Sequence, residues 1–142
     1  MAYLYRQKFN LSELVLKKSQ PKTIILAEPE EYLLALYSGY LMGDNFIVKH
    51  CTEVELLDDI IIEHSPHLLI LSVNFFEDLG KILELLNRIK NEYPFLPVVT
   101  TGFKLNSDHL KKIMSAGIVS HIERTLTRPK DISIIAGTIL NI

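Results

Sequence analysis

The sequence predicts an α/β fold in which a doubly wound, parallel sheet of five strands is joined by crossover helices. Short apolar runs alternate with longer segments whose apolar residues recur at helical spacing, which is the pattern of repeated strand–helix units. The run at 68–73 is almost entirely apolar, as expected for a strand covered on both faces. With 142 residues and 48% apolar residues, the chain has the size of a single domain.

Five strand–helix units can be placed in order along the chain. Apolar, β-branched runs predict strands at residues 23–27, 45–51, 68–73, 97–100 and 119–123. Apolar residues three and four apart predict helices at about residues 30–41, 52–63, 78–92, 107–116 and 129–140. Each helix is long enough to cross from the end of one parallel strand to the start of the next.

Several polar residues are predicted to begin these helices. Thr52 and Glu55 have the spacing of a capping box for the second helix. Asp78 is expected to cap the third helix, and either Asn106 or Ser107 the fourth.

An N-terminal extension, residues 1–21, precedes the body at 22–142 that contains the five units. Its residues 11–18 predict a short helix capped by Asn10 and Glu13, with Leu11, Leu14 and Val15 on one face. A helix of this length is marginal in isolation. We therefore expect it to dock on the body or on a partner, the alternative being that it stays disordered.

Charge is unevenly divided between the extension and the body. Residues 1–22 have a net charge of +4, so the remaining residues have −6 of the chain's total of −2. The extension and the body can therefore attract each other. The acidic body lacks the dense basic stripe of a nucleic-acid-binding protein, so no direct binding to nucleic acid is expected.

Composition also limits where the chain works and what it binds. No apolar run approaches the 18 to 20 residues or so that a bilayer requires, and residues 1–21 contain no long apolar core followed by a small-residue cleavage site. Cys51 is the chain's single cysteine, so it has no partner for a disulfide or a zinc site. We expect a cytoplasmic protein with no membrane contact, no bound metal and no cofactor.

Three short motifs point to a known family. They are AEPEE at the end of the first strand, TTG at the end of the fourth, and AGIVSHIERTL around the fifth. With the order and spacing of the elements, these motifs make residues 22–142 resemble the receiver domain of bacterial response regulators, the CheY-like domains. The resemblance implies the flavodoxin-like strand order 2-1-3-4-5.

The same resemblance implies a phosphorylation pocket, but this sequence departs from the family there. The family's acidic pair falls on Glu28 and Pro29, its phosphoacceptor aspartate on Ser72, its Thr or Ser switch on Thr101, and its lysine clamp on Arg124. Only Thr101 matches. The chain therefore resembles a degenerate pseudo-receiver that lacks the acceptor.

These departures remove the chemistry that magnesium and phosphoryl transfer need. Magnesium prefers charged oxygen ligands, whereas Pro29 has no side-chain oxygen and Ser72 has no charge. Glu28 would be left to hold the ion alone, opposite Arg124. We expect Arg124 and Glu28 to form a structural ion pair across the end of the sheet, with anion binding by Arg124 as the alternative.

Three further residues are candidates for contacts with a partner. Asn74 and then Phe75 and Phe76 follow Ser72 in a loop at the end of the sheet where such folds bind ligands. The two phenylalanines are expected either to fill the empty pocket or to contact a protein. His121 falls where receivers have a rotating aromatic residue; it is either a pH-sensitive element of that face or an exposed polar strand residue.

The resulting hypothesis is a phosphorylation-independent protein–protein interaction module in two-component-type signal transduction. Its partner would be a signalling protein, or alternatively a second copy of the chain. Contacts would come from the last two helices with the fifth strand, or from the extension and Phe75–Phe76. The alternative is a phosphorylatable receiver with a non-standard acceptor, such as Asp78 or Ser72 modified by another type of kinase.

An enzyme is not expected. Ser72 lacks the glycine-flanked turn that presents a serine nucleophile. The first strand is followed by EPEEY and not by the glycine-rich turn of a dinucleotide-binding protein.

Overall fold

The structure of the chain is a computed structural model that describes residues 20–141. The helix predicted at 11–18, with most of the extension 1–21, lies outside the described residues. The strands are β1 (Thr23–Ala27), β2 (Ile47–Cys51), β3 (Leu68–Ser72), β4 (Val98–Gly102) and β5 (Ser120–Glu123). The helices are α2 (Glu31–Gly43), α3 (Leu57–His64), α4 (Leu79–Glu92), α5 (Ser107–Ser115) and α6 (Ile132–Leu140).

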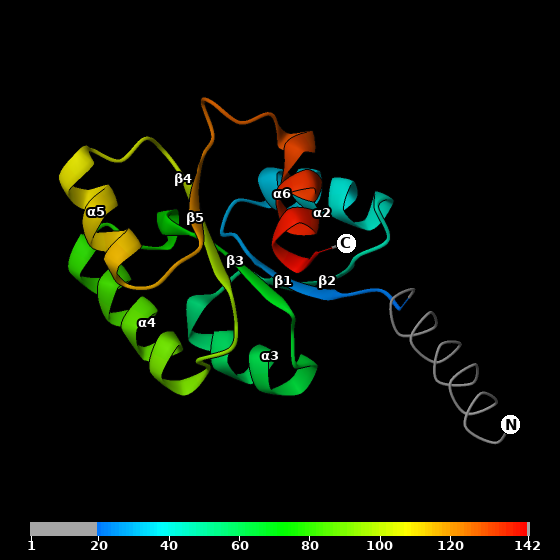
Figure 1. The fold of residues 1–142 in the computed structure, drawn as a ribbon, viewed down its shortest axis with the longest axis horizontal. Helices are drawn as coiled ribbons and strands as arrows, with labels where there is room; N and C mark the ends of the chain where they lie inside the picture. Colours follow the sequence, from blue (N-terminus) through cyan, green and yellow to red (C-terminus); the bar gives the residue numbers. More distant parts are fainter. Residues whose placement is uncertain (1–19, 142) are drawn as a thin grey trace, which may run out of the picture.

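All five strands are parallel and lie in the order β2-β1-β3-β4-β5, which confirms the predicted fold class and strand order. Helices α2 and α6 cover one face of the sheet, and α3, α4 and α5 cover the other (Figure 1). The carboxyl ends of the strands therefore meet at one edge, which we call the carboxyl edge. Among the described helices, none is long and apolar enough to span a membrane.

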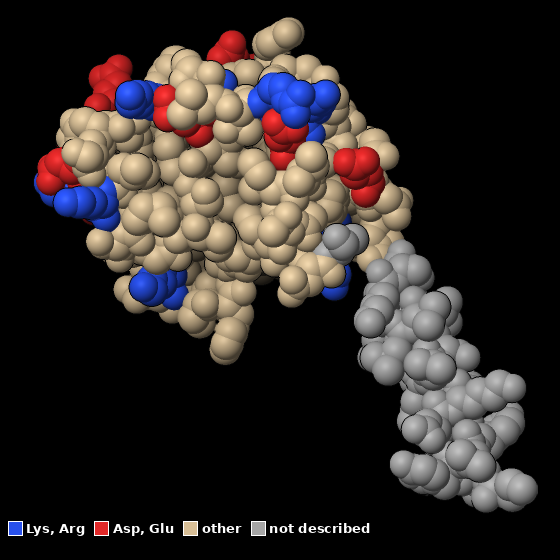
Figure 2. All heavy atoms as spheres, turned by 45° about the horizontal axis from the view of Figure 1, so that its top comes forward, with Lys and Arg blue, Asp and Glu red and all other residues tan. Residues whose placement is uncertain are grey.

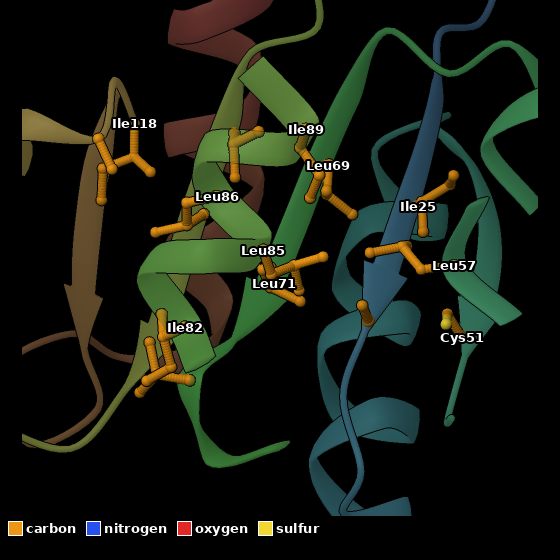
Figure 3. Packing of buried hydrophobic residues seen from close by; sticks show 14 of the residues in the cluster. Ile25, Cys51, Leu57, Leu69, Leu71, Ile82, Leu85, Leu86, Ile89 and Ile118 are labelled. Atoms are coloured by element: carbon orange, nitrogen blue, oxygen red, sulfur yellow. The ribbon is translucent and has the colours of Figure 1, made fainter. Parts of the chain in front are cut away.

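The central strands are apolar because helices cover them on both sides. All five residues of β3 are buried, and alternate residues point to opposite faces. Leu69 and Leu71 pack with Leu86 and Ile89 of α4 on one face, and the close-up in Figure 3 shows these side chains directed toward each other. Burial of each such side chain contributes roughly 1.5 to 3 kcal/mol.

Two predicted helix caps are present and one is wrong. Asp78 Oδ1 accepts a hydrogen bond from the Gly80 amide at 2.8 Å, and Asn106 Oδ1 accepts one from the His109 amide at 2.8 Å. The capping box of Thr52 and Glu55 does not form. Glu53 remains extended, a 3₁₀ turn follows at Val54–Leu56, and no side chain caps it. Thr52 therefore precedes the turn and cannot reach its amides.

Candidate functional site at the carboxyl edge

The sequence-predicted pocket residues converge at the carboxyl edge of the sheet. Glu28 directly follows β1, Ser72 ends β3, Thr101 lies near the end of β4, and Arg124 follows β5. The strand register pairs Ala27 with Leu71 and Ser72 with Thr101, so these ends lie side by side. We call this group the carboxyl-edge site.

An ion pair between Arg124 and Glu28 forms the centre of the site, as the sequence led us to expect. Arg124 Nη2 donates to Glu28 Oε1 at 3.0 Å, and the two side chains are only 14% and 1% exposed. The other Glu28 oxygen accepts the Glu30 amide at 3.0 Å, while the Glu30 carboxylate lies 3.9 Å from Arg124 Nη1. The Glu28 carboxylate therefore has a partner for each of its oxygens.

Two more side chains hold the Arg124 guanidinium in place. With its amide oxygen turned toward Arg124, Asn74 accepts from Nη1 at 3.0 Å and from Nη2 at 2.9 Å. The guanidinium carbon also lies 5.3 Å from the centre of the Phe103 ring, a cation–π distance. Arg124 thus links the ends of β1, β3 and β4.

Burial controls the titration of the acidic groups at this site. Desolvation raises the pKa of the Glu28 carboxyl above its ordinary value, against the opposing effects of the Glu30 amide and Arg124. Desolvation likewise raises the pKa of the buried Tyr37 hydroxyl, which Arg124 opposes and Glu28 reinforces. The ion pair therefore only partly compensates the cost of burying the Glu28 charge.

Ser72 has a structural role. Its side chain is fully buried, and its Oγ accepts a hydrogen bond from the Asn74 amide at 3.1 Å. This bond caps the 3₁₀ turn Val73–Phe75, which places Asn74 beside Arg124. A buried hydroxyl that is already engaged in a cap is poorly placed to accept a phosphoryl group.

The end of β4 closes tightly on the same turn. Gly102 has φ of +152°, and a Cβ at this position would lie 2.5 Å from Val73 Cγ2. The Gly102 carbonyl also accepts the Arg124 amide at 3.0 Å. Glycine is required here both for the positive φ and for the close approach of Val73.

The donor set at the carboxyl edge does not fit magnesium. Pro29 has no side-chain oxygen, Ser72 is neutral, and both Glu28 oxygens are already occupied. Over residues 20–141, no group of three or more His, Cys, Asp or Glu side chains could hold a metal ion.

His121 is not the exposed polar residue that was one of the two expectations. Its side chain is half-buried; Nδ1 lies 2.8 Å from Thr100 Oγ1, and Nε2 lies 3.1 Å from the Phe103 carbonyl. Because a carbonyl only accepts, Nε2 donates to the Phe103 carbonyl. His121 therefore links Thr100, its register partner on β4, to the backbone at Phe103.

Phe75 and Phe76 pack away from Arg124. Both are half-buried against the core cluster under α4, with ring centres 6.5 Å apart. Phe76 also lines a surface hollow of about 440 Å³ beside α4. The aromatic ring that covers Arg124 is Phe103, which the sequence analysis missed; the signal for it was an aromatic residue directly after TTG.

Comparison with known proteins identifies the fold. No family model matches the sequence, and no curated protein matches it. The structure is similar to a response regulator from Thermotoga maritima, with a TM-score of 0.76 and 17% identity over 86% of this chain and 99% of that chain. It is also similar to HP1043, an orphan response regulator of H. pylori, with a TM-score of 0.75 and 15% identity over 85% and 98% of the two chains.

A third similar structure is NtrX from Brucella abortus in complex with ATP, with a TM-score of 0.73 and 21% identity over 85% of this chain. The match spans only 27% of the NtrX chain. The structural neighbours are thus response regulators and CheY-like receiver domains. The present chain has the receiver fold, at identities that establish the fold alone.

Proposed function

We propose that this chain is an atypical receiver domain that acts in two-component-type signalling by binding another protein, without being phosphorylated. The observation that carries the proposal is the occupancy of the carboxyl-edge site. Arg124, Glu28 and Asn74 are bonded to each other there, and the Ser72 hydroxyl caps the adjacent turn. The site is built as a structural link between strand ends.

The geometry also argues against a substitute acceptor. Asp78 uses Oδ1 to cap α4 and belongs to the start of that helix, beyond the turn that contains Asn74. Ser72 is 0% exposed and out of reach of a kinase unless the domain opens locally. Phosphorylation at either residue would cost a capping hydrogen bond.

A surface for partner binding lies on α5, β5 and the loops beside them. Its exposed apolar side chains are Phe103, Leu110, Met114, Val119 and Leu126. Figure 2 shows one face of the molecule, on which charged side chains lie mainly toward the edges and leave a broad area with few of them. An exposed apolar surface with a polar rim is typical of a protein contact.

The proposed lack of phosphorylation is tested by measuring the midpoint of thermal unfolding with and without magnesium and beryllofluoride. Beryllofluoride occupies the phosphoryl position on a receiver aspartate, and a ligand at about 100 times its Kd adds roughly 2.7 kcal/mol to stability. We expect no shift for this chain and a shift of several degrees for a receiver with the aspartate. A clear shift here would show that a phosphorylatable site exists.

The binding part is tested by the double variant L110E/M114E, which places two charges on the α5 surface. We expect the variant to keep the wild-type midpoint, because both side chains are already exposed, and to lose binding at this surface. Sedimentation equilibrium of the wild type and the variant distinguishes a second copy of this chain from a different protein as the partner. A dimer that the variant dissociates identifies a second copy, whereas a monomer in both proteins points to a different signalling protein.

A further inference from the structure

The outward side of α3 combines exposed apolar and acidic residues in one strip. Leu56, Asp59 and Ile62 follow each other at spacings of three, which places them along the side of the helix opposite the buried Leu57 and Ile61. Leu56 is 47% exposed and Ile62 is 69% exposed. We call Leu56, Asp59, Ile62 and Glu63, with the preceding Glu53 and Glu55, the α3 strip.

The α3 strip carries uncompensated negative charge. Residues 53–63 contain acidic side chains and no Lys or Arg. Asp58, on the inner side of the helix, pairs with Arg88 at 2.7 Å. Within residues 20–141, Glu53, Glu55 and Asp59 have no basic partner in an ion pair, and Glu63 faces only His64.

The N-terminal extension joins the body next to this strip. The amide of Thr23, the first residue of β1, donates to His67 Nδ1 at 3.0 Å, and its carbonyl accepts the His67 amide at 2.8 Å. His67 follows α3 by three residues, so the extension joins the sheet beside the carboxyl end of α3. Ile47, which is 40% exposed, lies at the same point because its amide donates to the Lys22 carbonyl.

Ile47 also lies on the α3 face of the sheet. It is four residues from Cys51 on β2, so both side chains point to the same face. Cys51 is buried in the cluster that contains Leu57 and Ile61 of α3. Ile47 thus adds an exposed apolar side chain beside α3, near the point where residues 1–19 join the body.

The extension is complementary to the α3 strip in both apolar surface and charge. Residues 11–18 predict an eight-residue helix with Leu11, Leu14 and Val15 on one face, and α3 is also eight residues long. Basic residues occur at both ends of the segment: Lys17 and Lys18 near the body, and Arg6 and Lys8 about ten positions earlier. Glu63 and Glu53 are likewise separated by ten positions, Glu63 in the last turn of α3 and Glu53 just before the 3₁₀ turn that leads into the helix.

We propose that residues 11–18 of this same chain dock as a helix on the α3 strip and Ile47, parallel to α3. The direction follows from the connection, since Lys17 and Lys18 must lie near the carboxyl end of α3, beside Glu63 and Asp59. The four residues 19–22 span at most about 14 Å, which keeps the helix at this side of the body. Arg6 and Lys8 then lie toward Glu53, since Glu55 lines the hollow beside α4 together with Lys81 and Arg88. This inference does not depend on the proposed signalling role.

The test is amide hydrogen exchange of the full chain, followed at residues 11–18. We expect these amides to exchange at least about tenfold more slowly than in a free peptide of residues 1–19, because docking stabilises a helix that is marginal alone. The variants K17E/K18E and D59K/E63K should each remove the protection. The fourfold variant K17E/K18E/D59K/E63K exchanges the charges of the two segments and should restore the protection at residues 11–18.

The control is E31K/D44K, which makes the same change in charge on α2, at the opposite face of the sheet. It should leave the protection at 11–18 unchanged. Free-peptide exchange rates in the wild-type chain would overturn the proposal, as would equal loss of protection in the control. Protection that disappears on dilution would assign the α3 strip to the extension of a second copy and would also overturn it.

Discussion

The apolar core under α4 and the carboxyl-edge site both contain fully buried residues but are stabilised in different ways. Leu69 and Ser72 lie three residues apart on β3, and both are fully buried. Leu69 is surrounded by apolar side chains, whereas Ser72 belongs to a site held together by directed polar contacts, in which Arg124 Nε alone of the buried side-chain nitrogens and oxygens described has no hydrogen-bond partner. Loss of one group at the core leaves a cavity, while loss of one at the site leaves an unpaired charge or donor.

The largest effect is expected at the core, from L69A. Removal of a fully buried leucine side chain should lower the free energy of unfolding by about 3 kcal/mol or more, because the well-packed neighbours cannot fill the space. Chemical denaturation measures this loss. The volume-conserving variant L69M should cost less than about 1.5 kcal/mol. Equal losses for both variants would mean that shape, and not volume, controls this position.

The next effect tests the coupling at the carboxyl edge. R124M should cost about 3 kcal/mol, because it leaves the buried Glu28 carboxylate without its cationic partner. The double variant R124M/E28Q removes the charge as well and should recover part of that loss. A double-mutant cycle on the unfolding free energies gives the coupling. Additive single-variant effects would show that the two side chains are independent despite the 3.0 Å contact.

A smaller effect is expected from S72A. This variant removes the acceptor for the Asn74 amide and should cost about 1 kcal/mol, the usual value of one hydrogen bond or cap. For a domain of this size, the midpoint should fall by a few degrees. D78A, which removes the cap of α4, is the matched control at a site outside the pocket. A loss at S72A several times larger than at D78A would assign Ser72 a further role in the Arg124 cluster.

The smallest expected effect is the pH dependence of stability at the carboxyl-edge site, which the apolar core does not share. Because burial raises the pKa of Glu28, its contribution to stability is fully present below the ordinary value of 4.5 and is lost as pH rises through the folded-state pKa. The unfolding free energy of wild type minus that of E28Q should therefore fall as the pH rises above about 4.5. A difference that grows with pH would show that Arg124 lowers the pKa of Glu28 overall.

Sequence patterns predicted the order of the elements well because strands and helices have local periods. The five strands and five helices predicted between residues 22 and 142 are present, with ends that differ by a few residues. The caps at Asp78 and Asn106 were also predicted, since a cap acts on amides two or three residues away. The failure at Thr52 is instructive: the chain leaves β2 still extended, so the helix begins later than the local signal indicates.

The site could be predicted only in part. The positions of Glu28, Ser72, Thr101 and Arg124 follow from the parallel order of the strands, because the carboxyl ends of parallel strands meet at one edge. The part played by Phe103 over Arg124 did not follow, and neither did the bond between His121 and Thr100. These contacts depend on loop conformation and on register between strands, for which a single sequence has no local signal.

By itself, the sequence determined the class of fold, the alternation of elements and the absence of an aspartate at the end of the third strand. Tertiary structure alone decided how the remaining polar groups are used. Glu28 and Arg124 are 96 residues apart in the chain, and only the completed sheet brings them to 3.0 Å. Once they are buried together, desolvation makes each group depend on the other, and the pair links the ends of β1 and β5.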